Sequence, residues 1–263
     1  MMANKPIGFF DSGVGGSSIW KEVHRLLPNE HTIYLADSAN APYGNRTPQE
    51  IVALSIKNIE KLIEMGCKII VVACNTATTN AIDELRSTFD IPIIGIEPAI
   101  KPAALQTTSN SIGILATKGT LGSALFHKTA ATFTKEIQLV EIIGEGLVPL
   151  IEAGKLDSPE MLELLQNYIN PMLAAKIDYL VLGCSHYPYI IPQLRELLPA
   201  YVKIIDSGAA VAKQTKLILE ERDLLRKETT TPTLQFYTNK NTATLARLLS
   251  DVQDPLEISV LDF

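Results

Sequence analysis

Two cysteines each stand at the end of an apolar run, directly before a cluster of polar residues. Cys74 is followed by "NTATTN" and Cys184 by "SHYP". A free cysteine is most often a small buried hydrophobic residue, and Cys67 fits that interpretation. A cysteine between a strand end and a helix N-terminus differs, because the helix dipole favours the thiolate there. Cys74 and Cys184 are therefore candidates for acid–base or nucleophilic chemistry.

Two carboxylates and a histidine could exchange protons with these thiols. Asp11 lies in "FFDSGVGGSS", Glu152 lies near a predicted helix end, and His186 follows shortly after Cys184. Each has a plainer structural interpretation: Asp11 as a helix cap, Glu152 as a solvated carboxylate and His186 as a satisfied structural side chain. The G-x-G-G spacing after Asp11 does not match the dinucleotide fingerprint, so no nicotinamide cofactor is predicted.

Neutral hydrogen-bond donors follow other predicted strands. The turn at Pro42-Tyr43-Gly44 brings backbone amides and a phenol to the strand ends, although it could be an ordinary turn. Thr117 and Thr120 follow the run "SIGIL" and could bind a carboxylate or cap a helix. A metal site is not predicted, because zinc needs three or four ligands and the other histidines have no matching spacing.

Composition restricts the possible partners and location. The 263 residues carry a net charge of −6 with no block of Lys or Arg, which argues against nucleic-acid binding. No apolar run approaches a membrane span, and the N-terminal segment does not have the pattern of a signal peptide. Three cysteines without a CxxC pair are typical of a reducing cytoplasm.

The elements that must position these residues are strands and helices in alternation. Continuous apolar runs, typical of strands covered on both faces, recur at residues 6–10, 32–36, 68–73, 91–96, 111–115, 137–143, 178–183, 202–206 and 234–238. Helical patterns lie between them, one opened by a capping box at residues 47–50 and another by Ser158-Pro159. The alternation predicts an α/β, doubly wound fold with mainly parallel sheets, which bind ligands at the carboxyl ends of their strands.

Internal similarity indicates two copies of one α/β unit. The segment "IIVVACNTATTNAI" resembles "DYLVLGCSHYPYII", with Cys74 and Cys184 in matching positions. A second pair of similar segments matches Glu97 with Asp206. We therefore expect two pseudo-symmetric domains that face each other, with the active site in the cleft between them and one thiol on each side.

Two facing thiols suit the removal of a proton from one face of a carbon and the return of a proton to the other face. One must be a thiolate and the other a thiol, whereas an unperturbed thiol with a pKa of about 8.5 is only slightly ionised at neutral pH. Each cysteine therefore needs a proton partner: Asp11 for Cys74, and His186 with Glu152 for Cys184.

The motifs resemble those of the glutamate racemases, cofactor-independent enzymes of the aspartate/glutamate racemase family. The similarity is carried, in order along nearly the whole chain, by "DSGVGG", "PYG", "ACNTAT", "LVPLIEAG", "GCSHYP", "DSGAA" and "FYT". It implies interconversion of L- and D-glutamate by proton transfer at Cα, without cofactor or metal, to supply D-glutamate for peptidoglycan synthesis. We expect a cytoplasmic homodimer that binds neither nucleic acid nor membrane.

The resemblance also implies roles by position. Cys184 would take the proton from L-glutamate and Cys74 from D-glutamate. The tuning residues would be Asp11, Glu152 and His186. The implied substrate-binding residues are Asp11, Ser12, Tyr43, Gly44, Asn75, Thr76, Thr117, Thr120, Ser185 and His186. Two positions depart from the family: Ser185 stands where Thr is usual, and Phe126 where Tyr is common. We expect activity to survive the change to Ser185, and we expect the missing hydroxyl of Phe126 to affect packing near the cleft more than the chemistry.

The family fold implies that residues 1–98 with 208–263 form the domain of Cys74, and that residues 99–207 form the domain of Cys184. Two other functions stay open. A non-catalytic amino-acid-binding protein would need a cleft but not two thiols, and a thiol hydrolase would use Cys184 and His186 alone. Loss of Cys74 separates the three, because a binder would keep its affinity and a hydrolase its activity.

Overall fold

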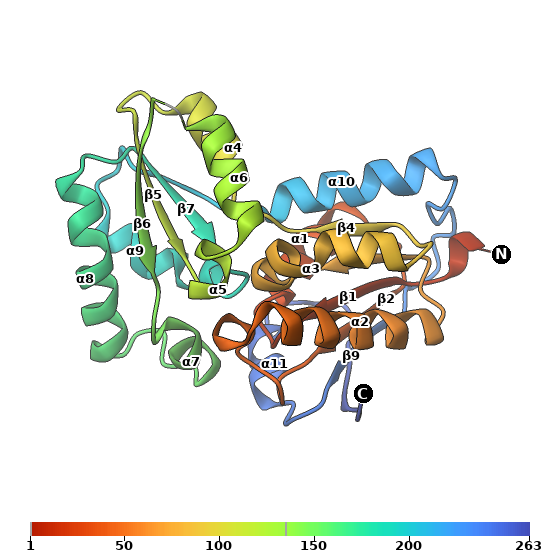
Figure 1. Cartoon of the computed structure of the whole chain (residues 1–263). Helices are drawn as coiled ribbons and strands as arrows, with labels where there is room; N and C mark the ends of the chain where they lie inside the picture. Colours follow the sequence, from red (N-terminus) through yellow and green to blue (C-terminus); the bar gives the residue numbers. More distant parts are fainter. Residues whose placement is uncertain (1, 135) are drawn as a thin grey trace.

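The computed structural model describes residues 2–134 and 136–263, and in these the strands form two sheets (Figure 1). The larger sheet has the order β10-β9-β2-β1-β3-β4, and the smaller sheet has the order β6-β5-β7-β8. Neighbouring strands run parallel throughout. The strands are β1 (Ile7–Asp11), β2 (Thr32–Ala36), β3 (Ile69–Val72), β4 (Ile93–Gly95), β5 (Ser111–Ala116), β6 (Gln138–Ile143), β7 (Tyr179–Gly183), β8 (Lys203–Ile205), β9 (Leu234–Thr238) and β10 (Glu257–Val260). The predicted α/β fold with parallel sheets is confirmed.

The two sheets repeat the same strand order. The run β2-β1-β3-β4 of the larger sheet corresponds to β6-β5-β7-β8 of the smaller sheet, so β3 corresponds to β7. Cys74 comes just after β3 and Cys184 directly after β7. The internal similarity of the sequence is thus visible in the topology, and it gives the two thiols equivalent positions.

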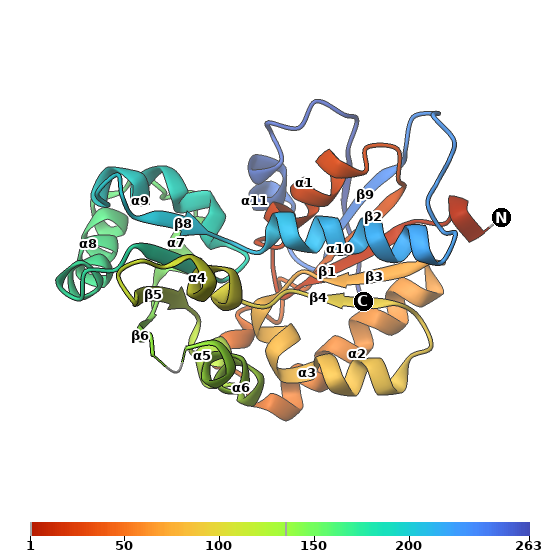
Figure 2. The same cartoon turned by 90° about the horizontal axis from the view of Figure 1, so that it is seen from above.

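Helices cover both faces of each sheet (Figure 2). On the larger sheet, one face carries α1 (Ser17–Leu26), α10 (Gly208–Glu221) and α11 (Ala243–Leu248), and the other carries α2 (Pro48–Glu64) and α3 (Asn75–Thr88). On the smaller sheet, one face carries α7 (Leu147–Glu152), α8 (Pro159–Ala174) and α9 (Ile191–Leu197), and the other carries α4 (Ile100–Gln106), α5 (Lys118–Leu121) and α6 (Ala124–Phe133). Each face has its own apolar core, which keeps the strand ends rigid.

Local sequence signals explain where the long helices begin. At the start of α2, Thr47 Oγ1 accepts from the Glu50 amide at 3.3 Å, and the Glu50 carboxylate accepts from the Thr47 amide at 2.8 Å. At the start of α8, Ser158 Oγ accepts from the Met161 amide at 3.2 Å. Both predicted helix starts are confirmed, because these side chains satisfy amides that the first turn leaves free.

The chain changes sheets twice. It leaves the larger sheet after β4, builds the smaller sheet from β5 to β8, and returns to the larger sheet with α10 (Figure 1). Two crossing segments therefore join the sheets. Across the described part of the chain, no helix combines the length and apolar character needed to cross a bilayer.

Candidate active site

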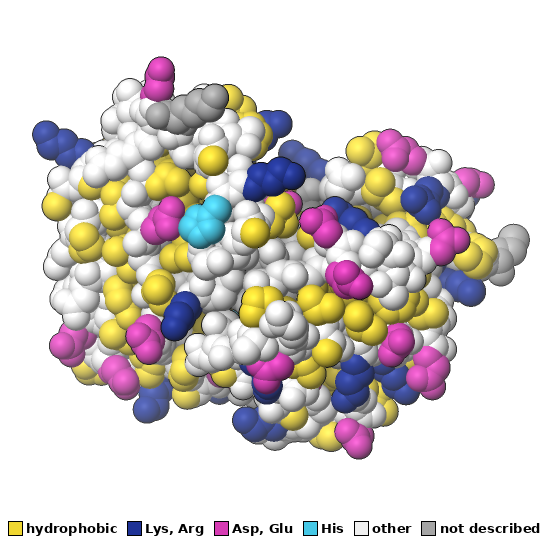
Figure 3. Space-filling view, viewed as in Figure 1, with side chains coloured by type: hydrophobic (Ala, Val, Ile, Leu, Met, Phe, Trp, Pro, Cys, Tyr) yellow, Lys and Arg dark blue, Asp and Glu magenta, His cyan; other side chains and the backbone are white. Residues whose placement is uncertain are grey.

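The two lobes of the molecule are in contact along their shared boundary (Figure 3). Residues of both lobes line a small pocket. Its cavity volume is about 20 Å³. Its lining residues are Ser12, Ala41, Pro42, Tyr43, Gly44, Cys74, Asn75, Thr76, Thr117, Val148, Glu152, Cys184, Ser185 and His186. Most of them follow the carboxyl ends of β1, β2, β3, β5 and β7, as expected for ligand sites in α/β sheets. Cys74 and Cys184 thus reach one pocket from different sheets.

The structure brings almost all of the predicted site residues together. Asp11 and Thr120 do not line the pocket but lie directly behind it, in contact with Ser185 and Thr117 respectively. Phe126 packs into the core beneath α6 and is absent from the pocket lining. The tyrosine-to-phenylalanine departure therefore lies in the core of the smaller sheet.

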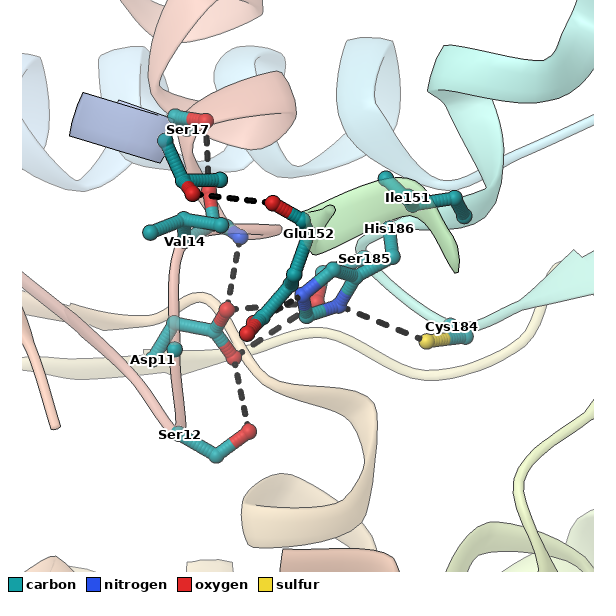
Figure 4. Close-up of polar contacts among 12 residues, drawn as sticks. Asp11, Ser12, Val14, Ser17, Ile151, Glu152, Cys184, Ser185 and His186 are labelled. Carbon is teal, nitrogen blue, oxygen red and sulfur yellow. Dashed lines mark hydrogen bonds and ion pairs between the residues drawn. The ribbon is translucent and has the colours of Figure 1, made fainter. Parts of the chain in front are cut away.

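His186 links Cys184 to Glu152 on one side of the pocket (Figure 4). The Cys184 Sγ lies 3.8 Å from His186 Nδ1, and His186 Nε2 lies 2.9 Å from Glu152 Oε1. Cys184 is 7% exposed and His186 is 4% exposed. A buried imidazole between a sulfur and a carboxylate is well placed to hold a proton.

The protonation states on this side follow from the contacts. Burial alone would lower the pKa of His186, but hydrogen bonds with Cys184 and Glu152 raise that pKa well above its usual 6.5. Burial would raise the pKa of Glu152, but the hydrogen bond and charge of His186 hold it below its ordinary value. His186 is therefore an imidazolium and Glu152 a carboxylate near neutral pH.

Cys74 sits in a different environment at the N-terminus of α3. Its S–H donates to Ser12 Oγ at 3.5 Å, and its Sγ accepts from the Ala77 amide at 3.4 Å. Burial, and then the charge of Asp11, raise the pKa of Cys74 far above its ordinary value. Burial also raises the pKa of Asp11. Cys74 is thus a neutral thiol in the absence of substrate. On the other side of the pocket, the His186 imidazolium lies beside the sulfur of Cys184.

The glycine-rich loop after β1 lets the two sides approach closely. Asp11 Oδ2 accepts from the Gly16 amide at 2.7 Å, and Ser185 Oγ lies 3.5 Å from both carboxylate oxygens of Asp11. A Cβ on Gly15 would lie only 2.2 Å from His186 Nδ1. Gly15 therefore allows the loop to pack closely against the other half of the pocket, where a side chain would collide with the His186 imidazole.

Asn75 offers hydrogen bonds that the rest of the chain leaves unused. Among the residues that the structure describes, neither its Oδ1 nor its Nδ2 has a partner, although the side chain is buried. Leaving a buried polar group without a partner costs about 1–3 kcal/mol, so a polar ligand at this point would be stabilised. Beside it, Thr117 Oγ1 lies 2.9 Å from the hydroxyls of both Thr76 and Thr120. This end of the pocket is a cluster of neutral groups.

Tyr43 lines the pocket, but its hydroxyl is already engaged. It donates to Asp37 Oδ2 at 2.5 Å and accepts from Asn58 Nδ2 at 3.0 Å. Burial, and then the charge of Asp37, raise the pKa of Tyr43 far above its ordinary value. Sequence reasoning missed Asp37, although its position directly after β2 follows the same strand-end rule. It also missed Val148, an apolar residue with no chemical signal.

The titratable groups at the pocket form two sets, one near each thiol. In residues 2–134 and 136–263, no group of three or more His, Cys, Asp or Glu side chains is arranged to hold a metal ion. The arrangement places a thiol with a nearby carboxylate and a cysteine in contact with an imidazole on the lining of one pocket. Such a site can remove a proton from one side of a bound carbon acid and supply one from the other.

Comparison with known proteins identifies the family. Residues 15–215 match the Asp/Glu/hydantoin racemase family. The glutamate racemase of Herpetosiphon aurantiacus is 43% identical over 247 residues, which cover 94% of this chain and 97% of that protein. The structure of Escherichia coli glutamate racemase with L-glutamate and the activator UDP-MurNAc-Ala is 33% identical, has a TM-score of 0.86, and covers 98% of this chain and 100% of that one.

A second solved structure agrees with the first. Glutamate racemase of Francisella tularensis subsp. tularensis, in complex with D-glutamate, is 27% identical with a TM-score of 0.85, and the match covers 99% of this chain and 98% of that one. The matches in sequence and structure extend over nearly the whole chain. The chain therefore belongs to the Asp/Glu/hydantoin racemase family, among the glutamate racemases.

Proposed function

We propose that this protein interconverts L-glutamate and D-glutamate by proton transfer at Cα between two cysteine thiols. The observation that carries the proposal is the position of Cys74 and Cys184 on one pocket, each with its own polar partners. Family membership supports glutamate as the substrate, because structures of glutamate racemases with the same fold contain L-glutamate or D-glutamate. The proposed reaction uses no cofactor.

In the L-to-D direction, the Cys184 thiolate removes the Cα proton and the electron pair delocalises into the adjacent carboxylate. The Cys74 thiol then gives its proton to the opposite face of Cα. D-glutamate forms, and the enzyme is left with a Cys184 thiol and a Cys74 thiolate. The D-to-L direction runs these steps in reverse. His186 with Glu152 would support charge at Cys184, and Asp11 would exchange charge with Cys74.

The substrate's own charges suit the two ends of the pocket. Neutral donors at one end would hold carboxylates, namely Ser12, Gly44, Asn75, Thr76, Thr117, Thr120 and Ser185, with Tyr43 supporting its loop. The ammonium group would lie toward Asp11, whose carboxylate is close behind the pocket. Asn75 is the strongest member of this set, because its buried amide has no partner among the described residues.

Entry of glutamate would require the lobes to separate, because the cavity is small and the side chains of Cys74, Cys184 and His186 around it are buried. The proposed domains are residues 1–98 with 208–263, and residues 99–207. The crossing segments near residues 98 and 208 would then act as hinges, and closure would exclude water from the reacting carbon.

The cellular role belongs to the same proposal. The enzyme would supply D-glutamate for peptidoglycan synthesis in the cytoplasm, which is consistent with three buried cysteines that are all free. We expect it to assemble as a homodimer, which sedimentation velocity measures directly.

Circular dichroism of the substrate tests the activity. Purified protein should remove the optical signal of L-glutamate and of D-glutamate, while the Cys74→Ala variant should leave both signals unchanged. Retained affinity without turnover in the wild type would favour a binding protein. Hydrolytic activity that survives in Cys74→Ala would favour a thiol hydrolase.

A further inference from the structure

Helix α11, which packs on the larger sheet, touches the helix that carries Glu152. In both ribbon views α11 and α7 lie close to each other (Figures 1 and 2). Thr244 Oγ1 and Arg247 Nη2 each donate to the backbone carbonyl of Glu152 at 2.8 Å. Arg247 Nη2 also lies 3.5 Å from the carbonyl of Ile151. Two side chains of one domain thus bind the last turn of a helix in the other.

These contacts cap the C-terminus of α7. The last carbonyls of a helix lack partners within it, and a cation is favourable beside them. The Gly154 amide donates to Ile151 O, but no backbone amide in the described ranges donates to Glu152 O. Gly154 has a φ of +72°, and a Cβ there would lie 2.6 Å from Arg247 Cζ. The guanidinium therefore fits against a position that only glycine leaves open.

The other end of the contact is firmly held. Leu245 and Leu248 of α11 are buried in the same core as Trp20. Lys21 Nζ of α1 donates to the Leu248 carbonyl at 2.7 Å. A movement of α7 relative to the larger sheet must therefore break the contacts of Thr244 and Arg247, because α11 cannot readily follow.

We propose that Thr244 and Arg247 form an interdomain latch, which positions Glu152 in the closed enzyme and releases when the pocket opens. The proposal rests on the proposed function for its kinetic consequence. Glu152 is held twice: its carbonyl by the latch and its carboxylate by His186 at 2.9 Å. Releasing the carbonyl would let the carboxylate move away from His186. Thr244 and Arg247 are therefore positioning residues that act through Glu152.

Cysteine alkylation by iodoacetamide, read at each thiol by mass spectrometry, tests the latch without any substrate. In Arg247→Ala and in Thr244→Val, the alkylation rates of Cys74 and Cys184 should rise about two- to fivefold, the range expected for a helix-terminus contact at the surface. Cys67 is an internal control, because it is buried in a core of the larger sheet and away from the pocket. Arg247→Lys should restore most of the protection.

A matched variant controls this experiment, and either of two outcomes would overturn the latch. Arg25→Ala removes an exposed arginine whose ion pair with Glu22 lies within α1, and it should leave all three rates unchanged. An equal rise at all three thiols in Arg247→Ala would mean general destabilisation and would overturn the latch. Unchanged rates at Cys74 and Cys184 would overturn it as well.

Kinetics give a second readout. Among the residues that the structure describes, three titratable groups face His186: Cys184 from its own loop, Glu152 from α7 and Asp11 from β1. Only Glu152 stands on a helix that the latch holds. Arg247→Ala should lower kcat/KM about two- to fivefold, equally in both directions because the enantiomers have equal free energy in water, and should move the alkaline limb to lower pH. An unaltered pH profile of kcat/KM in Arg247→Ala would contradict the latch. An inactive wild-type protein would contradict the proposed function instead, and the alkylation rates would then be the test of the latch.

Discussion

Cys74 and Cys184 follow equivalent strands, β3 and β7, of two sheets with the same strand order, and both line one pocket. Their surroundings are not equivalent. Cys184 faces the imidazolium of His186, whereas Cys74 is a buried thiol near Asp11. A symmetric scaffold thus gives its two thiols different partners, an imidazole on one side and a hydroxyl with a nearby carboxylate on the other.

Replacing either pocket thiol by serine should abolish racemisation in both directions. A serine hydroxyl is far less acidic than a thiol, and general acid–base groups contribute about 10²- to 10⁴-fold, so we expect kcat to fall at least about a thousandfold in Cys74→Ser and in Cys184→Ser. Cys67→Ala is the matched control, because Cys67 is buried outside the pocket. Its kcat should stay near the wild-type value, and a comparable loss there would argue against specific roles for the other two thiols.

Removing the charge of Glu152 should lower the pKa of His186. The folded-state pKa of His186 is raised above 6.5, so the stabilisation from its charge is complete below about pH 6.5 and is lost as pH rises through the folded value. In Glu152→Gln that loss should be complete at a lower pH, and the alkaline limb of kcat/KM should also shift to lower pH. NMR titration of the His186 ring measures the change, with exposed His127 as the internal reference. An unshifted His186 titration would refute the pairing.

Asn75 should contribute to substrate affinity and not to folding. In Asn75→Ala the KM for both enantiomers should rise about ten- to a hundredfold, the value of hydrogen bonds to a charged group. The melting temperature should not fall, because the amide has no partner in the described chain. Asn80→Ala provides the contrast: its amide donates to the carbonyls of Thr76 and Gly119, so its loss should cost about 1 kcal/mol of unfolding free energy. A destabilised Asn75→Ala with normal KM would contradict this assignment.

A side chain at Gly15 should disrupt the site without unfolding the protein. The new methyl group would lie 2.2 Å from His186 Nδ1, so the imidazole must move or the lobes must separate. We expect kcat/KM in Gly15→Ala to fall about a hundredfold, comparable to the loss of one general acid–base group. Gly122→Ala, with a φ of −78°, is the control and should retain activity. Equal activity in the two variants would show that close approach of the loop to His186 is unnecessary.

The overall fold could be predicted because parallel strands buried on both faces are continuous apolar runs. Each predicted run overlaps a strand, and the two copies of the unit appear as matching strand orders. Strand β10 was missed. Its sequence "EISV" is short and mostly exposed at the sheet edge, so it lacks an apolar run.

The sequence predicted those site residues that come shortly after a strand, but not the contacts between separate loops. That rule found the two thiols, Asp11 and the threonines, whereas the engagement of the Tyr43 hydroxyl by Asp37 depends on how two loops meet. Ser185 was predicted as a substrate donor, and its hydroxyl lies toward Asp11 in the structure, so its role stays a prediction. The contact of Arg247 with Glu152 joins segments far apart in the chain and leaves no local signal.

Deuterium incorporation during a single conversion tests the two-thiol account most directly. L-glutamate would be incubated with the enzyme in D₂O, and both enantiomers would be separated and analysed by mass spectrometry at early times. The account predicts D-glutamate with deuterium at Cα, since Cys74 carries a solvent-derived proton, while the remaining L-glutamate stays largely unlabelled. D-glutamate that retains the original proton would mean that one group moves it between the two faces, and the two-thiol mechanism would be wrong.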